Sequence, residues 1–207
     1  MQKITALLLV LFLTILLHGC TAASPIKRAV EITPDKTHFK NHLNSTDRKS
    51  SKLIELSTLN GFRKKPRNIH DAWADSYISA AINKRTSEIT YQINSVIEYK
   101  DHDKRSYRKV SYRTILGKEK ETKEAKVLNH TISCQGSAYS GCIHTEYVVF
   151  TIDSTLIESL ANSYAEEPPN KWRYQLSPKK GRSYSAHLFI AEIAALVEKA
   201  NSINNFK

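Results

Sequence analysis

The sequence feature that most constrains the fold is the alternation of apolar and polar side chains between Glu88 and Ile152. Within 88–99 nearly every second residue is apolar, which puts an apolar face opposite a polar one on an extended strand. The same pattern predicts three more strands, at about 105–116, 124–134 and 143–152. Because the connections between successive strands are short, we expect these four strands to form an antiparallel meander.

Helical periodicity is seen on both sides of these strands. In 71–84 apolar residues recur at i, i+3 and i+4, and Asp71 is a suitable N-cap, so an N-terminal helix is expected there. Further elements are predicted as a helix at 155–162 capped by Asp153 and Ser154, strands at 171–176 and 184–188, and a closing helix at 189–200. This order predicts an α+β fold, with an N-terminal and a C-terminal helix packed on one face of an antiparallel meander sheet.

The N-terminus has the features of an export signal. One lysine precedes an apolar run from Ile4 to Leu17, which is shorter than the roughly 20 residues of a membrane-spanning helix. The run ends in Leu17-His18-Gly19-Cys20, which resembles the lipobox of bacterial lipoproteins. Two other interpretations stay open: an ordinary secretory signal in which Cys20 is incidental, and an uncleaved membrane anchor.

The lipobox resemblance implies that residues 1–19 are a signal peptide and that Cys20 carries the lipid. In that family the cysteine sulfur receives a diacylglycerol, the chain is cut before the cysteine, and the new amino group is acylated. Several acyl chains, at about 0.8 kcal/mol per buried methylene, anchor a protein stably in the membrane. Since Asp after the cysteine often retains Gram-negative lipoproteins in the inner membrane, Thr21 implies the outer membrane, facing the periplasm.

Two other stretches resemble small bacterial envelope lipoproteins of unknown function. The first is Asp71–Lys84 leading into Tyr91-Gln92-Ile93, and the second is the tail that runs from Gly181 through Ala191–Val197. This resemblance supports the envelope location and the fold class. It implies no catalytic residue.

Composition divides the rest of the chain into a tether and one domain. Residues 20–70 have scattered Pro, Ser, Asn and Lys without a sustained period, so we expect a lipidated N-terminus and a flexible basic tether. Residues 71–207 are expected to form a single α+β domain. The formal charge of the chain is +11, and 21–70 hold 11 basic and 4 acidic residues, so much of the excess lies beside the anionic bilayer.

Two cysteines, Cys134 and Cys142, enclose a short insert that contains Gly and Ser. In an exported protein such a pair most often forms a disulfide, and lipidation of Cys20 leaves an even number. The alternative is a zinc site, because His130 and His144 flank the pair and complete four N/S ligands. Their H-x3-C-x7-C-x-H spacing fits no familiar zinc ribbon, so we favour the disulfide and expect no metal and no cofactor.

The strand expected at 105–116 is rich in basic residues and tyrosine. On a regular strand, one face would hold Tyr107, Lys109, Ser111 and Arg113, and the other Arg108, Val110 and Tyr112. Basic residues interleaved with aromatics can bind single-stranded nucleic acid, but an envelope location makes that a poor partner. We therefore consider lipopolysaccharide phosphates, phospholipid head groups or teichoic polymers, beside the simpler interpretation of a solvated face. The candidate anion-binding residues are Arg105, Arg108, Lys109 and Arg113.

Motifs of known reactions are absent from the sequence. It has no G-x-S-x-G, no G-x-G-x-x-G, no phosphate-binding loop and no H-E-x-x-H, and acid pairs such as Asp101 and Asp103 fall in predicted turns. We expect a non-enzymatic binding or accessory module, held at the membrane, that meets a partner protein or an anionic envelope component. The alternative is an envelope hydrolase with an unrecognised site near the Cys134–Cys142 loop or on the open sheet face.

Overall fold

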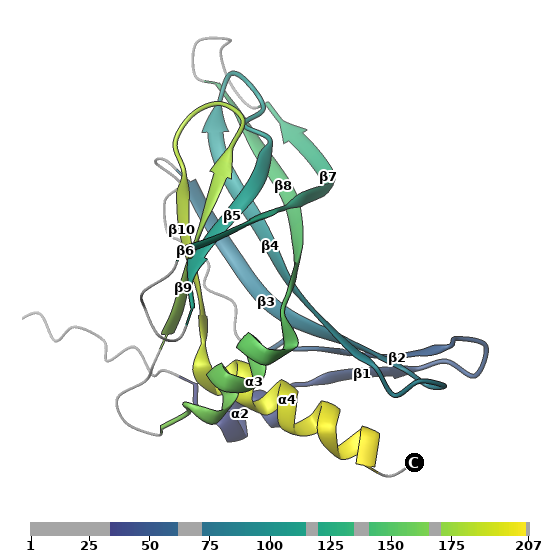
Figure 1. Ribbon diagram of the computed structural model, residues 1–207. Helices are drawn as coiled ribbons and strands as arrows, with labels where there is room; N and C mark the ends of the chain where they lie inside the picture. Colours follow the sequence, from purple (N-terminus) through teal and green to yellow (C-terminus); the bar gives the residue numbers. More distant parts are fainter. Residues whose placement is uncertain (1–33, 62–71, 115–119, 135–140, 166–170, 206–207) are drawn as a thin grey trace, which may run out of the picture. The chain divides into compact units, whose positions relative to one another are not determined.

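The computed structural model describes residues 34–61, 72–114, 120–134, 141–165 and 171–205, all within one compact unit, Thr33–Lys207. These residues form two antiparallel sheets, and their helices lie together at one end of the sheets (Figure 1). The expected α+β class with antiparallel strands is therefore confirmed.

The larger sheet, sheet A, has the strand order β1-β2-β3-β4-β8-β7. Its strands are β1 (Asn44–Asp47), β2 (Leu53–Ser57), β3 (Ala72–Asn83), β4 (Ile89–Asp101), β7 (Lys126–Ser133) and β8 (Cys142–Ile152). In β4 the alternate residues Tyr91, Ile93 and Tyr99 are buried, as the sequence pattern predicted. The predicted strands at 88–99 and 143–152 are thus two adjacent inner strands of this sheet.

The smaller sheet, sheet B, has the order β10-β9-β5-β6. Its strands are β5 (Tyr107–Arg113), β6 (Lys120–Glu124), β9 (Lys171–Pro178) and β10 (Tyr184–Phe189). The single meander that we expected is wrong, because β4 pairs with β8 and not with β5. The chain leaves sheet A before β5, where Ser106 has a positive φ of 55° and the N–H groups of Ser106 and Tyr107 donate to the Glu146 carboxylate on β8.

The helix expected at 71–84 is also wrong, because this segment forms β3. Its buried side chains, Ile78, Ala80 and Ile82, follow the period of 2 of a strand. The apolar residues of the segment also satisfy helical spacing, and pairing with β2 and β4 on either side decides between the two patterns.

Part of the expected tether is folded. Residues 34–61 form α2 (Lys36–Asn41), β1 and β2, and Ile54 and Leu56 of β2 are buried in the main core. Phe39 of α2 packs with Phe189 and Ala195 in a smaller apolar cluster. The described domain therefore begins well before residue 71, while 20–33 and 62–70 lie outside the described residues.

The chain passes from sheet B to sheet A at a single residue, Ala125, between β6 and β7. Residues 120–123, which fall between the strands expected at 105–116 and 124–134, belong to β6, which pairs with β5. The next strand, β7, pairs with β8 as expected for a hairpin. One continuous stretch of chain therefore forms an edge strand of each sheet.

The helices close one end of the space between the sheets. Asp153 caps α3 (Ser154–Asn162) by accepting from Thr155 N–H, as predicted, and α4 (Ile190–Asn205) extends beyond the expected end at residue 200. Helix α4 contacts β2 and β3 of sheet A and β10 of sheet B. The expected C-terminal helix is confirmed.

Candidate anion-binding site

The basic strand β5 contains a bulge that changes which side chains face the core. Its pairing with β9 shifts between Tyr107 and Lys109, so Arg108 is an extra residue without its own partner on β9. Tyr107 is buried, and the next two residues, Arg108 and Lys109, are both exposed. The expectation that Tyr107 shares a face with Lys109 is therefore wrong, because a bulge reverses the alternation at that point.

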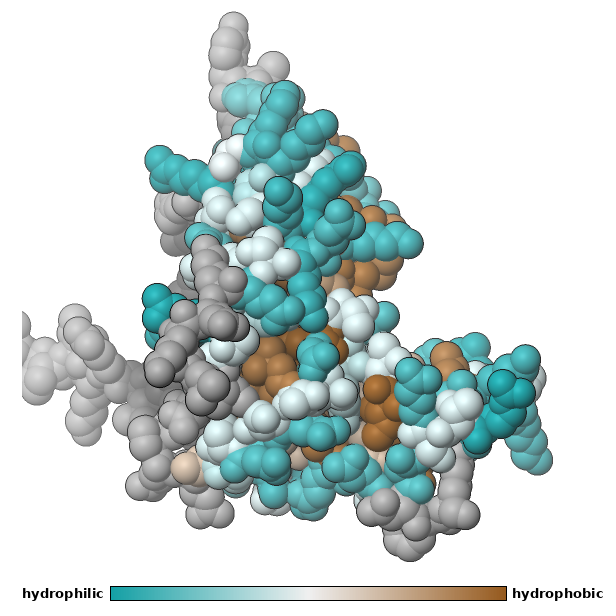
Figure 2. All heavy atoms as spheres, in the orientation of Figure 1, coloured by the Kyte–Doolittle hydropathy of each residue, from teal (hydrophilic) through white to brown (hydrophobic). Residues whose placement is uncertain are grey.

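The bulge lies at a cleft of about 730 Å³ between β5 and β6 of sheet B and β4, β7 and β8 of sheet A. We call this cavity the basic cleft. Its charged lining residues are the cations Lys104, Arg108, Lys109 and Lys126 and the acid Glu124. The face around β5 and β6 is largely hydrophilic in Figure 2. Four cations beside one acid can hold a phosphate or carboxylate group by charge-assisted hydrogen bonds.

The crossing at Ala125 shapes the basic cleft. Ala125 N–H donates to the Arg108 carbonyl at 2.7 Å, which ties the β6–β7 junction to the bulge. The pairing of β7 with β8 reaches only from Ser133 to Lys126, opposite Val149. Beyond that point Thr151 of β8 and its partner Gln92 of β4 add polar side chains to the cleft.

The structure separates the four candidate anion-binding residues. Arg108 and Lys109 line the basic cleft, whereas Arg113 lines a second cavity. Arg105 is only 8% exposed; its Nε lies 3.0 Å from Asp101 Oδ2, and its guanidinium lies 4.6 Å from the centre of the Tyr99 ring. Burial lowers the pKa of Arg105, but hydrogen bonds with Tyr107 and Asp101 outweigh it and raise the pKa above its ordinary value. Arg105 is therefore a structural cation.

Two cations of the basic cleft, Lys104 and Lys126, were missed by the sequence analysis. Lys104 lies in the turn before β5, and Lys126 begins a strand of the other sheet. The sequence marks both as basic but gives no sign that the chain crosses between sheets at Ala125. Only that crossing brings Lys126 to the same cavity as Arg108.

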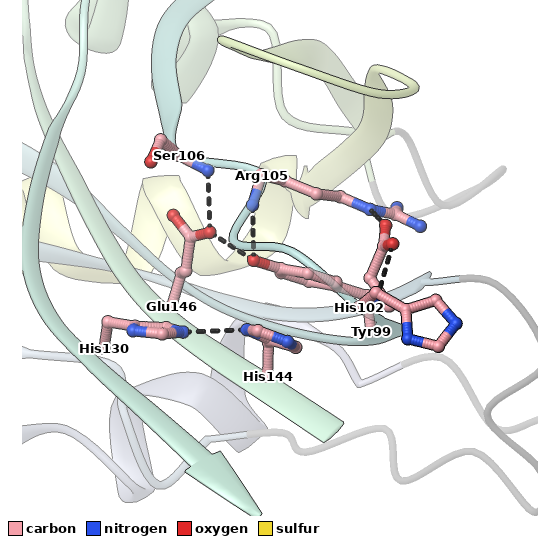
Figure 3. Close-up of polar contacts among 8 residues, drawn as sticks. Tyr99, His102, Arg105, Ser106, His130, His144 and Glu146 are labelled. Atoms are coloured by element: carbon pink, nitrogen blue, oxygen red, sulfur yellow. Dashed lines mark hydrogen bonds and ion pairs between the residues drawn. The ribbon is translucent and has the colours of Figure 1, made fainter. Parts of the chain in front are cut away.

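A buried polar cluster lies beside the basic cleft, at the start of β5 (Figure 3). The Glu146 carboxylate accepts from the Tyr99 hydroxyl, from Ser106 N–H at 2.9 Å and from Tyr107 N–H at 3.1 Å. Arg105 N–H donates to the Tyr99 hydroxyl at 2.9 Å. Burial, and then the bond to Glu146, raise the pKa of Tyr99. The cluster satisfies the polar groups that begin β5 and so fixes where that strand enters sheet B.

Two histidines extend the polar cluster. His130 Nε2 and His144 Nδ1 lie 3.0 Å apart, so one ring donates and the other accepts (Figure 3). The His144 ring stacks on His130 and on Tyr99, with 5.2 Å between centroids in both cases. Burial, and then the nearby charge of Lys104, lower the pKa of His130.

The expected disulfide is present. Cys134 and Cys142 are bonded, with 4.4 Å between their Cα atoms, and they close the end of the β7–β8 hairpin. The bond uses both sulfur atoms, so the zinc site with these thiolates and the two histidines is not formed. Among the residues that the structure describes, no group of three or more His, Cys, Asp or Glu is placed to hold a metal ion.

Comparisons with protein-family models, with curated proteins and with solved structures found no match for this chain. None of the helices in the described ranges is long and apolar enough to cross a membrane.

Proposed function

We propose that this chain is a lipid-anchored protein of the cell envelope and acts as a non-enzymatic binding module for an anionic envelope component. Its membrane partner is the bilayer that holds the acyl chains on Cys20, and in a Gram-negative cell the outer membrane, facing the periplasm. The ligand site is the basic cleft.

The observation that carries the proposal is the bulge at Arg108. A regular strand would point Arg108 and Lys109 to opposite faces, and only one would reach the cavity. The bulge exposes both side chains to the basic cleft, where Lys104 and Lys126 add two more cations. Glu124, directly opposite Lys109 on β6, is the one acid among the described lining residues, so the cleft keeps a net positive charge.

The hydrolase alternative has less support in the described residues. No histidine or cysteine is among the described lining residues of the basic cleft, of the second cavity or of the cavity between α2 and α4. The histidine pair bonds to itself inside the polar cluster.

Calorimetric titration with pyrophosphate tests the ligand site, with the full chain in an uncharged detergent. We expect the double variant R108Q/K109Q to bind pyrophosphate about tenfold or more weakly, since it loses two charge-assisted contacts. The matched control is K52Q/R85Q, which removes the same charge from exposed residues outside the cleft. Equal loss in both variants, or no binding by the natural chain, would reject the site.

Replacement of Cys20 by Ser tests the anchor. We expect the variant to lose incorporation of labelled palmitate and to leave the membrane fraction of cells. The control C134S/C142S should keep the label, because those cysteines are joined in the hairpin. Persistent labelling of Cys20→Ser would contradict lipidation at this residue.

A further inference from the structure

Strand β5 connects the basic cleft to a second basic cavity, of about 770 Å³, at its other end. The charged residues that line this second cavity are Arg113, Lys171 and Arg173, and no acid is among its described lining residues. Two cavities with an excess of cations therefore lie along one strand, with Arg108 and Lys109 at its start and Arg113 at its end.

The exposed cations Lys109 and Arg113, one from each cavity, lie on the same face of β5. From Lys109 to Arg113 the pairing with β6 is regular, and Val110 and Tyr112 between them are buried, so Lys109 and Arg113 point away from the core. Ser111 lies between them in the same alternation; it is only 8% exposed, and what remains accessible lines the second cavity. Gln175 of β9 lies opposite Ser111 and lines the second cavity with it. At about 3.4 Å per residue, Lys109 and Arg113 are separated by about 14 Å along the strand.

The side chains on this face indicate the kind of ligand. Three aromatic residues, Tyr112, Trp172 and Tyr174, line the second cavity. Each is at most 7% exposed and Trp172 packs against both tyrosines, so they offer little ring surface on which a base could stack. Ser111 and Gln175, between the basic groups, are suited to hydrogen bonds with uncharged hydroxyl or ester oxygens.

The number of cations favours phosphate over carboxylate. The second cavity is lined by three cations and by no described acid. One carboxylate group would neutralise only one of these three positive charges. A phosphate group brings more acceptor oxygens, which match the forked donors of Arg113 and Arg173.

We propose that one linear phosphate polymer occupies both cavities, running along β5 with its phosphates at the two basic ends and its linkers over Ser111 and Gln175. The proposal rests on the proposed function and names the ligand class of that site. A ligand long enough to reach both ends makes the second contact within the same complex, so its affinity exceeds that of a short anion.

Titration of the full chain in uncharged detergent with long-chain polyphosphate and with pyrophosphate tests this inference. We expect the long chain to bind about 100-fold more tightly than pyrophosphate. The variant R113Q/R173Q should lose this advantage of length and still bind pyrophosphate in the basic cleft. R113K/R173K keeps both charges and should retain most of the advantage, while K52Q/R85Q should retain all of it.

The outcomes separate this inference from the proposed function. If pyrophosphate binds and the long chain binds no more tightly, the spanning ligand is rejected and the basic cleft stands. If R113Q/R173Q keeps the full advantage of length, the second cavity is not part of the site. If a single-stranded oligonucleotide of equal charge binds more tightly than polyphosphate, the ligand class is wrong. If neither phosphate ligand binds, the proposed function fails.

Discussion

The polar cluster and the basic cleft are built from the same short segment, 104–109, and use charge in opposite ways. In the cluster, Arg105 pairs with Asp101, and Glu146 accepts three hydrogen bonds. In the cleft, cations from the same segment outnumber the acids among the described lining residues. Satisfied buried charges thus fix the start of β5, and the neighbouring Arg108 and Lys109 stay exposed at the cleft.

Removal of the Glu146 carboxylate should have the largest effect on the polar cluster. Glu146→Ala leaves the Tyr99 hydroxyl and two backbone N–H groups buried without their acceptor. At roughly 1–3 kcal/mol for each unsatisfied group, we expect a loss of about 4 kcal/mol in the free energy of unfolding, measured by urea denaturation. A loss below about 1 kcal/mol would show that the cluster does not hold β5 in place.

Glu192 of α4 is a second buried carboxyl group, and burial outweighs the hydrogen bonds that it accepts. It accepts from the Thr58 hydroxyl, and burial raises its pKa from 4.5 to about 8. Between these values the folded state keeps a proton that the unfolded state has lost, so stability falls as the pH rises from about 4.5 to about 8.

Glu192→Gln removes this titration. We expect the variant to be more stable than the natural chain at pH 7 by up to about 3 kcal/mol, and to match it near pH 4.5. Urea denaturation across this pH range measures the difference. An unchanged pH profile in the variant would assign the pH dependence to another group.

Removal of the disulfide tests whether closure of the β7–β8 hairpin contributes to the stability of the fold or to ligand binding in the basic cleft. Cys142 lies opposite Asp101 in the pairing of β4 and β8, next to the polar cluster. Because the bond closes a short loop, we expect C134S/C142S to lose about 2.5 kcal/mol of stability and to keep its affinity for pyrophosphate. Thermal unfolding and calorimetry measure the two effects, and a parallel loss of affinity would show that the cleft depends on hairpin closure.

Substitution of the exposed cations of the basic cleft should have the smallest effect on stability. Arg108 and Lys109 are exposed, so R108Q/K109Q should change the free energy of unfolding by less than about 0.5 kcal/mol. A gain in stability would indicate that repulsion among the cleft cations strains the unliganded fold. A clear loss would mean that these residues hold the bulge as well as the ligand.

The sequence was sufficient to predict those features that depend only on residues close together in the chain. The alternation around Tyr91 and Ile93, the cap at Asp153, the closing helix and the disulfide pair were all predicted, because each depends on neighbouring residues. Burial of a strand's alternate side chains requires only that a core exists on one side.

The parts that were missed depend on contacts between distant segments. Whether 72–83 is a helix or a strand depends on its pairing with β2 and β4, and whether β4 pairs with β5 or β8 depends on Glu146, far along the chain. The bulge at Arg108 is a shift in register against β9. The second half of the basic cleft follows from the crossing at Ala125, which composition does not reveal.

The crossing at Ala125 also bears on the cost of binding. Since β6 and β7 are joined by this one residue, the walls that they contribute to the basic cleft cannot separate unless a strand leaves its sheet. A ligand would then meet a cavity that is already assembled, and little conformational entropy would be lost on binding. Such preorganisation would let a small number of surface charges bind the proposed anion without an induced closure of the site.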